Sequence, residues 1–509
     1  MTHVLAIDLG ASGGRVIRGS WDAKEKKLSL HEIHRFDNVP VEVRGTLYWD
    51  ILRLFHEIKT GIRQAVRTLP EGEVVASLGI DTWGVDFGLL DASGQLLGNP
   101  IHYRDSRTDG EVDRLSSLLG EGTLFRQTGI QDAWFNTVYQ LTGALKKDAG
   151  YFLKAQTLLF TPDLLNYFFT GIKAAERTIA STSQLLVAGT TVWADELFTR
   201  LKLPRSLMQT VVEPGTLLGP VTPELAADLG LKPGTPVAVV PSHDTESAAL
   251  AVPAKTQPGH SFVFVSCGTW SVMGAELTAP VLSDAARKAG FSNEAGSDGT
   301  NLLLRNIMGM WLLQECKRWW ERDGVALDHG ALVDLAATAP AWKHHIDVNH
   351  SLFATPGDMP SRIQAYCQTT GQPVPADRAA ILRCVLESLA CVFRQSLAEM
   401  ETMAGFQADE LWLVGGGARN KLLCAVTATV TGRLVKTGPA ETTALGNIGS
   451  QFKALGLFAS TSDVRQAIGE SFGTGIYEPR PDGLSEAAYA RWSHIVVHAP
   501  KEMSGLVSK

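Results

Sequence analysis

The order of secondary structure expected in the first eighty residues constrains the fold more than any other feature of this sequence. Compact apolar runs at 4–9 and 15–21, followed by an alternating run at 27–36, predict three consecutive strands. Apolar residues then recur at helical spacing over 47–66, and 74–80 has the composition of a further strand. A Rossmann unit or a barrel repeat alternates strand and helix from its start. This order therefore excludes both.

A similar beginning recurs in the second half of the chain. Residues 261–266 and 270–277 predict two strands joined by a short turn that contains a glycine. Between the two halves, 251–259 contains two prolines and a glycine, which favours a boundary. Beyond these strands we expect helices at 306–322 and 378–403, a strand at 410–414, a helix from about 419, a strand at 434–436 and a helix near 444–457.

This organisation predicts an α/β protein of two domains, each opening with a strand–turn–strand hairpin. We place the domains at 1–250 and 258–480, followed by a C-terminal extension at 481–509. A cleft between two such domains is a natural place for a donor to meet an acceptor, and closure about a hinge near 251–259 would exclude water from it.

Composition excludes several function classes. Hydrophobic residues make up 45% of the chain, charged residues 19%, and the net charge is −7. These values are typical of a globular protein and give no support to a nucleic-acid or anionic-membrane partner. The sequence has neither a signal-peptide pattern nor an apolar stretch of about 18 residues that would span a membrane. We therefore expect a cytoplasmic protein, a monomer or a homodimer.

All six cysteines lie after residue 266, and no two of them form a CxxC pair. That spacing argues against a zinc site or a disulfide framework. Buried, reduced thiols are the expected state.

The first predicted turn, at 10–14, is a candidate anion site. Its three glycines let consecutive backbone N–H groups converge on one anion, because no Cβ blocks the approach. Ser12 adds a hydroxyl donor and Arg15 a cation, while Asp8 stands at the strand end, where it can hold Mg²⁺ directly or through water. An ordinary hairpin with an accidental acid is the alternative. The G-x-S-x-G pattern also matches a hydrolase nucleophile elbow, but that motif needs a helix after the serine, and a strand is expected here.

A second candidate is Ser242-His243-Asp244-Thr245, which follows the apolar strand 237–240. Adjacent residues on an extended chain point to opposite faces, so these types cannot form a serine–histidine–aspartate relay. Asp244 can instead accept a proton from a substrate hydroxyl that attacks the γ-phosphorus of a nucleotide. The alternative is a helix cap, since Asp244 and Thr245 precede a helical segment.

Two further glycine turns lie in the second half. Gly268 and Thr269 repeat the first hairpin turn and can bind phosphate, although a repeated hairpin without a ligand is the alternative. Gly415-Gly416-Gly417 lies between a predicted strand and a predicted helix, where a flat ring or a phosphate can approach the backbone. Neither GxGxxG nor GxxxxGK[ST] fits here, which excludes the dinucleotide-binding and P-loop signatures.

Taken in order, these motifs resemble those of the FGGY carbohydrate kinases of the actin-like ATPase superfamily. The resemblance runs from residue 4 to about 480. The strings that carry it are Asp8–Arg15, Gly268–Ser271, Leu413–Asn420 and Glu441–Gly446, together with His34–Phe36, Gly79–Phe87, Tyr103–Thr108, Ser242–Thr245 and Asn306–Gln314.

The resemblance implies two actin-like, ribonuclease-H-like domains with a catalytic cleft between them, and ATP with Mg²⁺ as cosubstrate and metal. It implies that Asp244 is the catalytic base and that Asp8 holds the metal, through water. The implied sugar contacts are Gly84, His243, Asp244, Thr245 and Asn306. The implied ATP contacts are Ala11, Ser12, Gly13, Gly14, Arg15, Thr269, Gln314 and Gly416.

The longer strings imply a ketose substrate, L-rhamnulose, phosphorylated to L-rhamnulose 1-phosphate in L-rhamnose catabolism. Another ketose or polyol, such as L-fuculose, L-xylulose or L-ribulose, is the alternative. A non-catalytic sugar or nucleotide sensor would lack the base, whereas Asp244 is present. Trp83, Phe87 and Trp134 are candidates for an apolar wall against a sugar methyl group, with a place in the core as the alternative for each.

Overall fold

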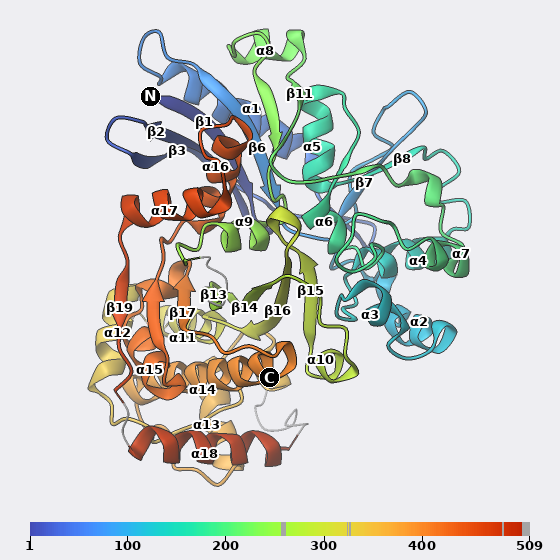
Figure 1. Ribbon diagram of the computed structural model, residues 1–509. Coiled ribbons are helices and arrows are strands. Elements are labelled where there is room, and N and C mark those ends of the chain that lie inside the picture. Colours follow the sequence, from blue (N-terminus) through green and yellow to red (C-terminus); the bar gives the residue numbers. More distant parts are fainter. Residues whose placement is uncertain (256–260, 323, 325–326, 481–482, 501–509) are drawn as a thin grey trace. The chain divides into compact units, whose positions relative to one another are not determined.

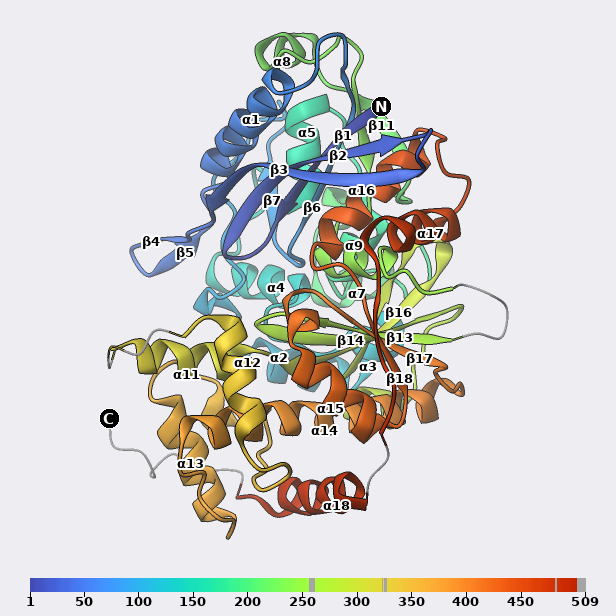
Figure 2. The same cartoon turned by 90° about the vertical axis from the view of Figure 1, so that its left-hand side faces the viewer.

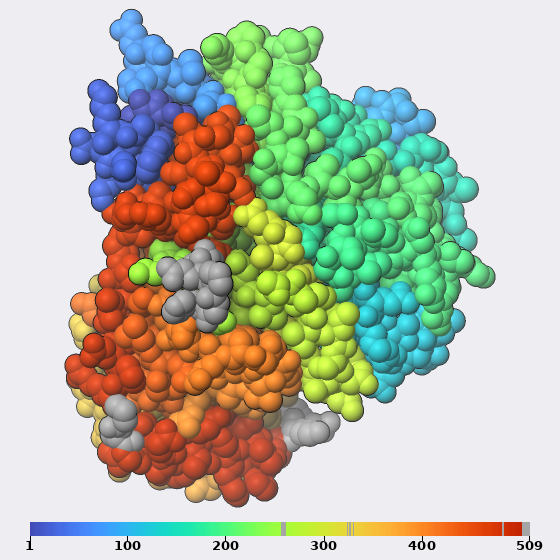
Figure 3. All heavy atoms as spheres, viewed as in Figure 1, coloured from blue at the N-terminus to red at the C-terminus, as the bar shows by residue number. Residues whose placement is uncertain are grey.

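The computed structural model describes residues 1–255, 261–322, 324, 327–480 and 483–500, and residues 256–260 of the predicted hinge lie outside this part. The chain divides into two compact units (Figure 1). Unit 1 comprises Met1–Lys255, Glu276–Leu303 and Glu441–Phe472, and unit 2 comprises Thr256–Ala275, Leu304–Ala440 and Gly473–Lys509. Two segments distant in sequence thus complete unit 1. Figure 3 shows the later one, in orange and red, packed against the blue N-terminal strands of the same unit.

The main sheet of unit 1 has the strand order β11-β12-β6-β1-β2-β3. The first three strands form an antiparallel meander, whereas β1, β6 and β12 run parallel to one another. Their bounds are β1 Thr2–Leu9, β2 Gly13–Asp22, β3 Lys27–Asp37, β6 Val75–Thr82, β11 Thr216–Pro220 and β12 Pro236–Val239. The three strands predicted at the N-terminus are confirmed.

Helices cover both faces of this sheet, which explains why β1 is an uninterrupted apolar run up to Asp8. Leu5 and Ile7 pack in a core with α1 (Ile51–Arg67) and α5 (Thr161–Thr170). Val4 and Ala6 face the other way, into a core with α16 (Thr442–Ala454) and α17 (Thr461–Phe472). Figure 2 shows α1 and the pair α16 and α17 on opposite sides of β1–β3.

Unit 1 has a third core, around β7 (Phe87–Leu90) and β8 (Thr157–Phe160). Its remaining elements are β4 Val41–Val43, β5 Thr46–Tyr48, β9 Ala175–Glu176, β10 Val211–Val212, β15 Phe291–Ala295, α2 Glu111–Leu119, α3 Thr123–Thr128, α4 Thr137–Lys147, α6 Arg177–Ser181, α7 Asp195–Leu201, α8 Pro223–Leu229, α9 Asp244–Leu250 and α10 Asp284–Lys288.

The strands of unit 2 follow the order β16-β14-β13-β17-β18-β19. They are β13 Phe262–Cys267, β14 Trp270–Leu277, β16 Asn301–Met308, β17 Glu410–Val414, β18 Leu434–Thr437 and β19 Gly475–Tyr477, and the ends of β14 and β16 are counted with unit 1. The helices are α11 Trp311–Arg322, α12 His329–Thr338, α13 Met359–Thr369, α14 Arg378–Ala404, α15 Lys421–Thr431 and α18 Gly483–His498.

One predicted helix is wrong at its start. Residues 306–308 belong to β16, and α11 begins only at Trp311. The reason is a close backbone approach at Gly309, where a Cβ would lie 2.7 Å from the Gly268 carbonyl oxygen. Backbone N–H groups of Met310 and Trp311 then donate to the 268–269 turn, which fixes where the helix starts.

The cysteines and the C-terminal extension both contribute to the interior of the protein. All six cysteines are buried and free, as predicted. The C-terminal extension contains α18, whose Trp492 is buried and donates its indole N–H to the carbonyl of Ile346 at 2.9 Å. Within the described ranges, no helix is long and apolar enough to cross a membrane.

Unit 1 depends on a close approach between α9 and α16. A Cβ at Gly446 would lie 1.8 Å from the carbonyl oxygen of Ser247, so Gly446→Ala must separate the two helices. We expect the free energy of unfolding to fall by about 3 kcal/mol, at the upper end for overpacked sites, as measured by chemical denaturation. Gly483→Ala is the control, since open space surrounds that helical glycine. Equal stability of the two variants would contradict this account of the packing.

Candidate functional site

Parallel strands bring three aspartates to one edge of the unit 1 sheet. Asp8 lies opposite Asp81 in the register of β1 and β6. The next parallel strand, β12, leads to His243, which bridges to Thr82 at the end of β6, and Asp244 follows. Ligand sites of open α/β sheets lie at such carboxyl ends.

These aspartates disfavour one another's charge. The pKa of Asp8 is raised, and burial is the largest cause. Arg15 opposes this shift, whereas the negative charge of Asp244 adds to it. Burial and the neighbouring Asp8 raise the pKa of Asp81 well above its usual range. Asp81 Oδ1 has no hydrogen-bond partner among the described residues, although Asn447 Nδ2 donates to Oδ2 at 2.6 Å. A buried, unpaired carboxylate oxygen beside Asp8 suits a hard divalent cation.

The first glycine turn is shaped by a residue that the sequence analysis missed. Asn38 Nδ2 donates to the carbonyl of Gly10 at 3.0 Å, and its backbone N–H donates to that of Ser12 at 3.2 Å. Gly10 N–H donates to the carbonyl of Gly13 at 2.8 Å, so the hairpin closes tightly. Ala11 and Ser12 are exposed at its tip. The residue after Ser12 begins β2, which excludes the hydrolase elbow.

Arg15 is held by carboxylates within unit 1. Its guanidinium pairs with Asp8 at 2.5 Å and also with Glu441, which directly precedes α16. This pairing keeps a cation beside the glycine turn and favours the ionised form of Asp8.

The Ser242–Thr245 segment is fixed by Glu176, another residue missed from sequence. The Glu176 carboxylate accepts from the N–H and the hydroxyl of Ser242, at 3.1 and 2.6 Å. It also caps α6, where it accepts from the N–H groups of Thr178 and Ile179. One buried side chain thus ties the strand end to a helix start.

Asp244 is the first residue of α9, and His243 is the N-cap. The His243 side chain makes no capping hydrogen bond, and the Asp244 carboxylate accepts hydrogen bonds from Thr245, the next residue. The side chain is 35% exposed, which leaves it accessible to a substrate. Desolvation raises the pKa of Asp244, while His243 and a hydrogen bond from Thr245 oppose that shift.

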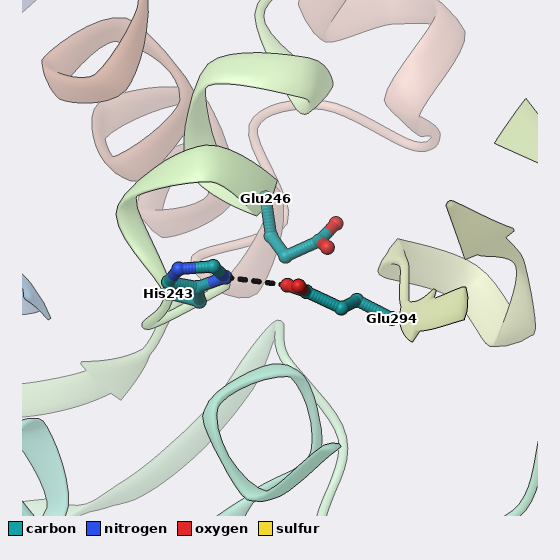
Figure 4. A group of neighbouring side chains, drawn as sticks. All are labelled: His243, Glu246 and Glu294. Atoms are coloured by element: carbon teal, nitrogen blue, oxygen red, sulfur yellow. Dashed lines mark ion pairs between the residues drawn. The ribbon is translucent and has the colours of Figure 1, made fainter. Parts of the chain in front are cut away.

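His243 lies between two carboxylates. Its Nε2 is 3.4 Å from Asp244 Oδ1, and its Nδ1 is 2.8 Å from Glu294 Oε2 (Figure 4). Burial disfavours the imidazolium, but the charge and hydrogen bond of Glu294, together with the charges of Asp244 and Glu176, raise the pKa of His243 to about 9. Gly84 adjoins the ring, because a Cβ there would lie 3.3 Å from Nε2. Val85, the next residue, has φ of +69°, a strained conformation for a β-branched residue.

Unit 2 contains a cavity of about 560 Å³ around the second and third glycine turns. Gly416 opens onto free space, whereas a Cβ at Gly417 would meet Cys267 Sγ at 2.3 Å. Thr269 Oγ1 donates to Gln314 Oε1 at 3.2 Å, which brings two predicted nucleotide contacts together. The cavity is lined by Cys267, Gly268, Met310, Leu313, Gln314, Lys317, Gly330, Leu332, Val333, Asp334, Gly416, Gly417, Arg419, Asn420 and Lys421.

The structure groups the predicted site residues by unit. Gly84, His243, Asp244 and Thr245 adjoin one another in unit 1, whereas Asn306 is exposed on β16 in unit 2. The predicted ATP contacts at 11–15 belong to unit 1, and Thr269, Gln314 and Gly416 belong to unit 2.

The three aromatic candidates all lie in unit 1 and differ in burial. Trp83 is buried in the core with α1 and α5, Phe87 is buried in the core around β7 and β8, and Trp134 is 44% exposed. The core alternative therefore holds for the first two.

Solved structures share this fold. A glycerol kinase from Plasmodium falciparum matches with a TM-score of 0.81 over 98% of each chain, at 15% identity. A xylulose kinase from Rhodospirillum rubrum matches with a TM-score of 0.79 over 97% of this chain and 98% of its own, at 19% identity. The fold is thus that of the sugar kinases with actin-like ATPase architecture.

The sequence then gives the family. The N-terminal domain of the FGGY family of carbohydrate kinases matches residues 3–251, and its C-terminal domain matches residues 263–455. Rhamnulokinase from Bacteroides thetaiotaomicron is 39% identical over 97% of this chain and 99% of its own. Rhamnulokinase from Enterococcus faecalis is 40% identical over 94% of each. The chain belongs to the FGGY family of carbohydrate kinases.

The aspartate cluster predicts a pH-dependent difference in stability. A raised pKa in the folded state means that folding stability is lost as pH rises above about 4, where unfolded aspartate ionises. Asp81→Asn removes that cost, so in EDTA its free energy of unfolding should exceed that of wild type by about 1–3 kcal/mol at pH 8. Near pH 3, the free energies of unfolding of wild type and Asp81→Asn should be equal.

Denaturant titrations at both pH values measure the difference. The exposed Asp37→Asn variant is the control and should follow wild type. A wild type that gains stability over Asp81→Asn from pH 4 to 8 would contradict the prediction.

Proposed function

We propose that this carbohydrate kinase transfers the γ-phosphoryl group of ATP to L-rhamnulose, giving L-rhamnulose 1-phosphate in L-rhamnose catabolism. The observation that carries the proposal is the Asp244 carboxylate, which is accessible at the start of α9 and adjacent to His243. The substrate is inferred from two rhamnulokinases that share 39% and 40% identity with nearly the whole chain.

In this proposal, the sugar binds beside Asp244, with His243, Thr245 and Gly84 as contacts in unit 1 and Asn306 as a contact from unit 2. Thr245 already donates to Asp244 at 3.3 Å, so a sugar hydroxyl would take up a second position on the carboxylate. The ring of His243 presents Nε2 on the same side. Asp244 thus orients the attacking hydroxyl.

The nucleotide binds in the unit 2 cavity, with adenosine against Gly416 and phosphates near Thr269 and Gln314. The volume of about 560 Å³ is within the range of small-molecule sites. Ala11, Ser12, Gly13, Gly14 and Arg15 contact the phosphates through the first turn. A divalent ion, which we propose to be Mg²⁺, would be held by Asp8 and Asp81 and would neutralise phosphate charge.

Phosphoryl transfer passes through a loose transition state, so the protein mainly positions the reactants. The sugar oxygen bonds to the γ-phosphorus as the bond from phosphorus to the β–γ bridging oxygen breaks, and ADP leaves. The hydroxyl proton passes late to Asp244. Water competes as a nucleophile, and we propose that closure near 251–259 excludes it.

We propose that the protein is cytoplasmic and that it acts on small molecules as a monomer or a homodimer. It needs neither a nucleic acid nor a membrane for this reaction.

Replacement of the base tests the central role. Asp244→Asn keeps the size of the side chain but cannot accept the proton, so kcat should fall by about 10²–10⁴-fold. A coupled assay of sugar-dependent ADP release measures it, over a panel of L-rhamnulose, L-fuculose, L-xylulose and L-ribulose. L-rhamnulose should give the highest kcat/KM.

Asp284→Asn is the matched control, since Asp284 is also the first residue of a short helix in unit 1. Nearly full turnover by Asp244→Asn would refute the role of that residue. A higher kcat/KM for another sugar would refute L-rhamnulose as the substrate.

A side chain at Gly416 tests the nucleotide site. No atom lies within 4 Å of the added Cβ, and the residue lacks a positive φ, so Gly416→Val should fold normally. The side chain would enter the cavity and weaken ADP binding by about tenfold or more, an effect of ~1.4 kcal/mol. Calorimetry measures the affinity, with Gly98→Val, another open glycine, as control. Unchanged ADP affinity would place the nucleotide elsewhere.

A further inference from the structure

A second cluster of ionisable groups lies on the far side of His243 from Asp244. His243 Nδ1 and carboxylate oxygens of Glu246 and Glu294 all lie within 4.8 Å of one another. Glu246 is the third residue of α9, and Glu294 lies on β15. All three belong to unit 1. Figure 4 shows the side chains converging from these elements.

Glu246 lacks any partner that would explain its burial. The residue is 2% exposed, and in the part of the chain that the structure describes neither carboxylate oxygen has a hydrogen-bond partner. Figure 4 shows its side chain beside that of Glu294. An ionised carboxylate in such a place costs several kcal/mol unless a cation compensates it.

Nearby cations of the protein are already engaged. Arg177 is buried, but it donates to the carbonyls of Gly296 and Thr300, and its Nε lies 3.6 Å from Glu213. His243 supplies one positive charge at most, and its Nδ1 is paired with Glu294. Among the described residues, Arg177 therefore offsets the charge of Glu246 only from a distance, and no cation pairs with that carboxylate directly.

We propose that His243 Nδ1, Glu246 and Glu294 bind a divalent transition-metal ion of the Mn²⁺ or Zn²⁺ class. One imidazole nitrogen and two carboxylates suit these ions, whereas Mg²⁺ and Ca²⁺ prefer oxygen ligands alone. The site is separate from the ion that accompanies the nucleotide, which falls to Asp8 and Asp81. It does not depend on which sugar is phosphorylated.

The proposed ion would also position His243. A metal on Nδ1 leaves the proton on Nε2, the nitrogen 3.4 Å from Asp244 Oδ1. The imidazole would then donate toward the catalytic carboxylate and the sugar in one fixed tautomer.

Metal binding can be measured on the full chain without nucleotide or sugar. After EDTA treatment and dialysis, wild type is titrated with Mn²⁺ and the free ion is followed by electron paramagnetic resonance. Glu246→Gln and Glu294→Gln should each weaken binding by at least tenfold. Asp8→Asn, a change at the other acidic site, should leave one Mn²⁺ bound. Thermal unfolding confirms that each variant is folded.

A diffraction experiment tests the proposed metal site without the use of variants. Wild-type crystals soaked in Mn²⁺ or Zn²⁺ should give an anomalous peak between the three side chains. The proposal is overturned if saturating metal gives no peak there, or if Mn²⁺ binding is lost in Asp8→Asn but retained in Glu246→Gln.

Discussion

The hydrogen bonds from α16 to β1 and β6 hold unit 1 together around its site. Gln451 Nε2 donates to the carbonyl of Leu5 at 3.0 Å, and Ser77 donates to Gln451 Oε1 at 2.6 Å. Asn447, one turn earlier, donates to Asp81. These side-chain amides form hydrogen bonds with buried polar groups of the strands. They also bring Glu441, at the start of the helix, to Arg15, so one helix sets both the strand edge and the charge beside the first turn.

The same edge concentrates negative charge at a cost to folding. Asp8, Asp81 and Asp244 each have a raised pKa, and for each of them burial is the largest cause. A protein selected only for stability would replace such groups, because buried unpaired charge is destabilising. Such a cost to folding is expected where carboxylates bind cations or exchange protons, which are the roles proposed for these three.

Local patterns predicted the parts of the structure that depend on neighbours in sequence. The apolar runs gave β1–β3, and the glycines marked the turns, because strand alternation and turn geometry are local properties. Asp81, Glu176 and Glu294 were missed as site residues, since only strand register and long-range packing bring them to His243 and Asp8. The start of α11 was wrong for a similar reason: its position depends on the contact of Gly309 with a distant turn. Nothing local in the later segment Glu441–Phe472 shows that it folds with unit 1.

The three aspartates at the strand edge differ in the groups that already contact them, and that difference supports the roles proposed for them. Asp8 forms an ion pair with Arg15. Asp81 is buried and accepts a hydrogen bond from Asn447. Asp244 accepts hydrogen bonds from Thr245 and has a 3.4 Å contact with His243, and of the three it is the one that is substantially exposed. A general base must reach its substrate and must have lone pairs to spare. Of the three, Asp244 best fits the proposed role of base, while Asp8 and Asp81 better fit the proposed cation site.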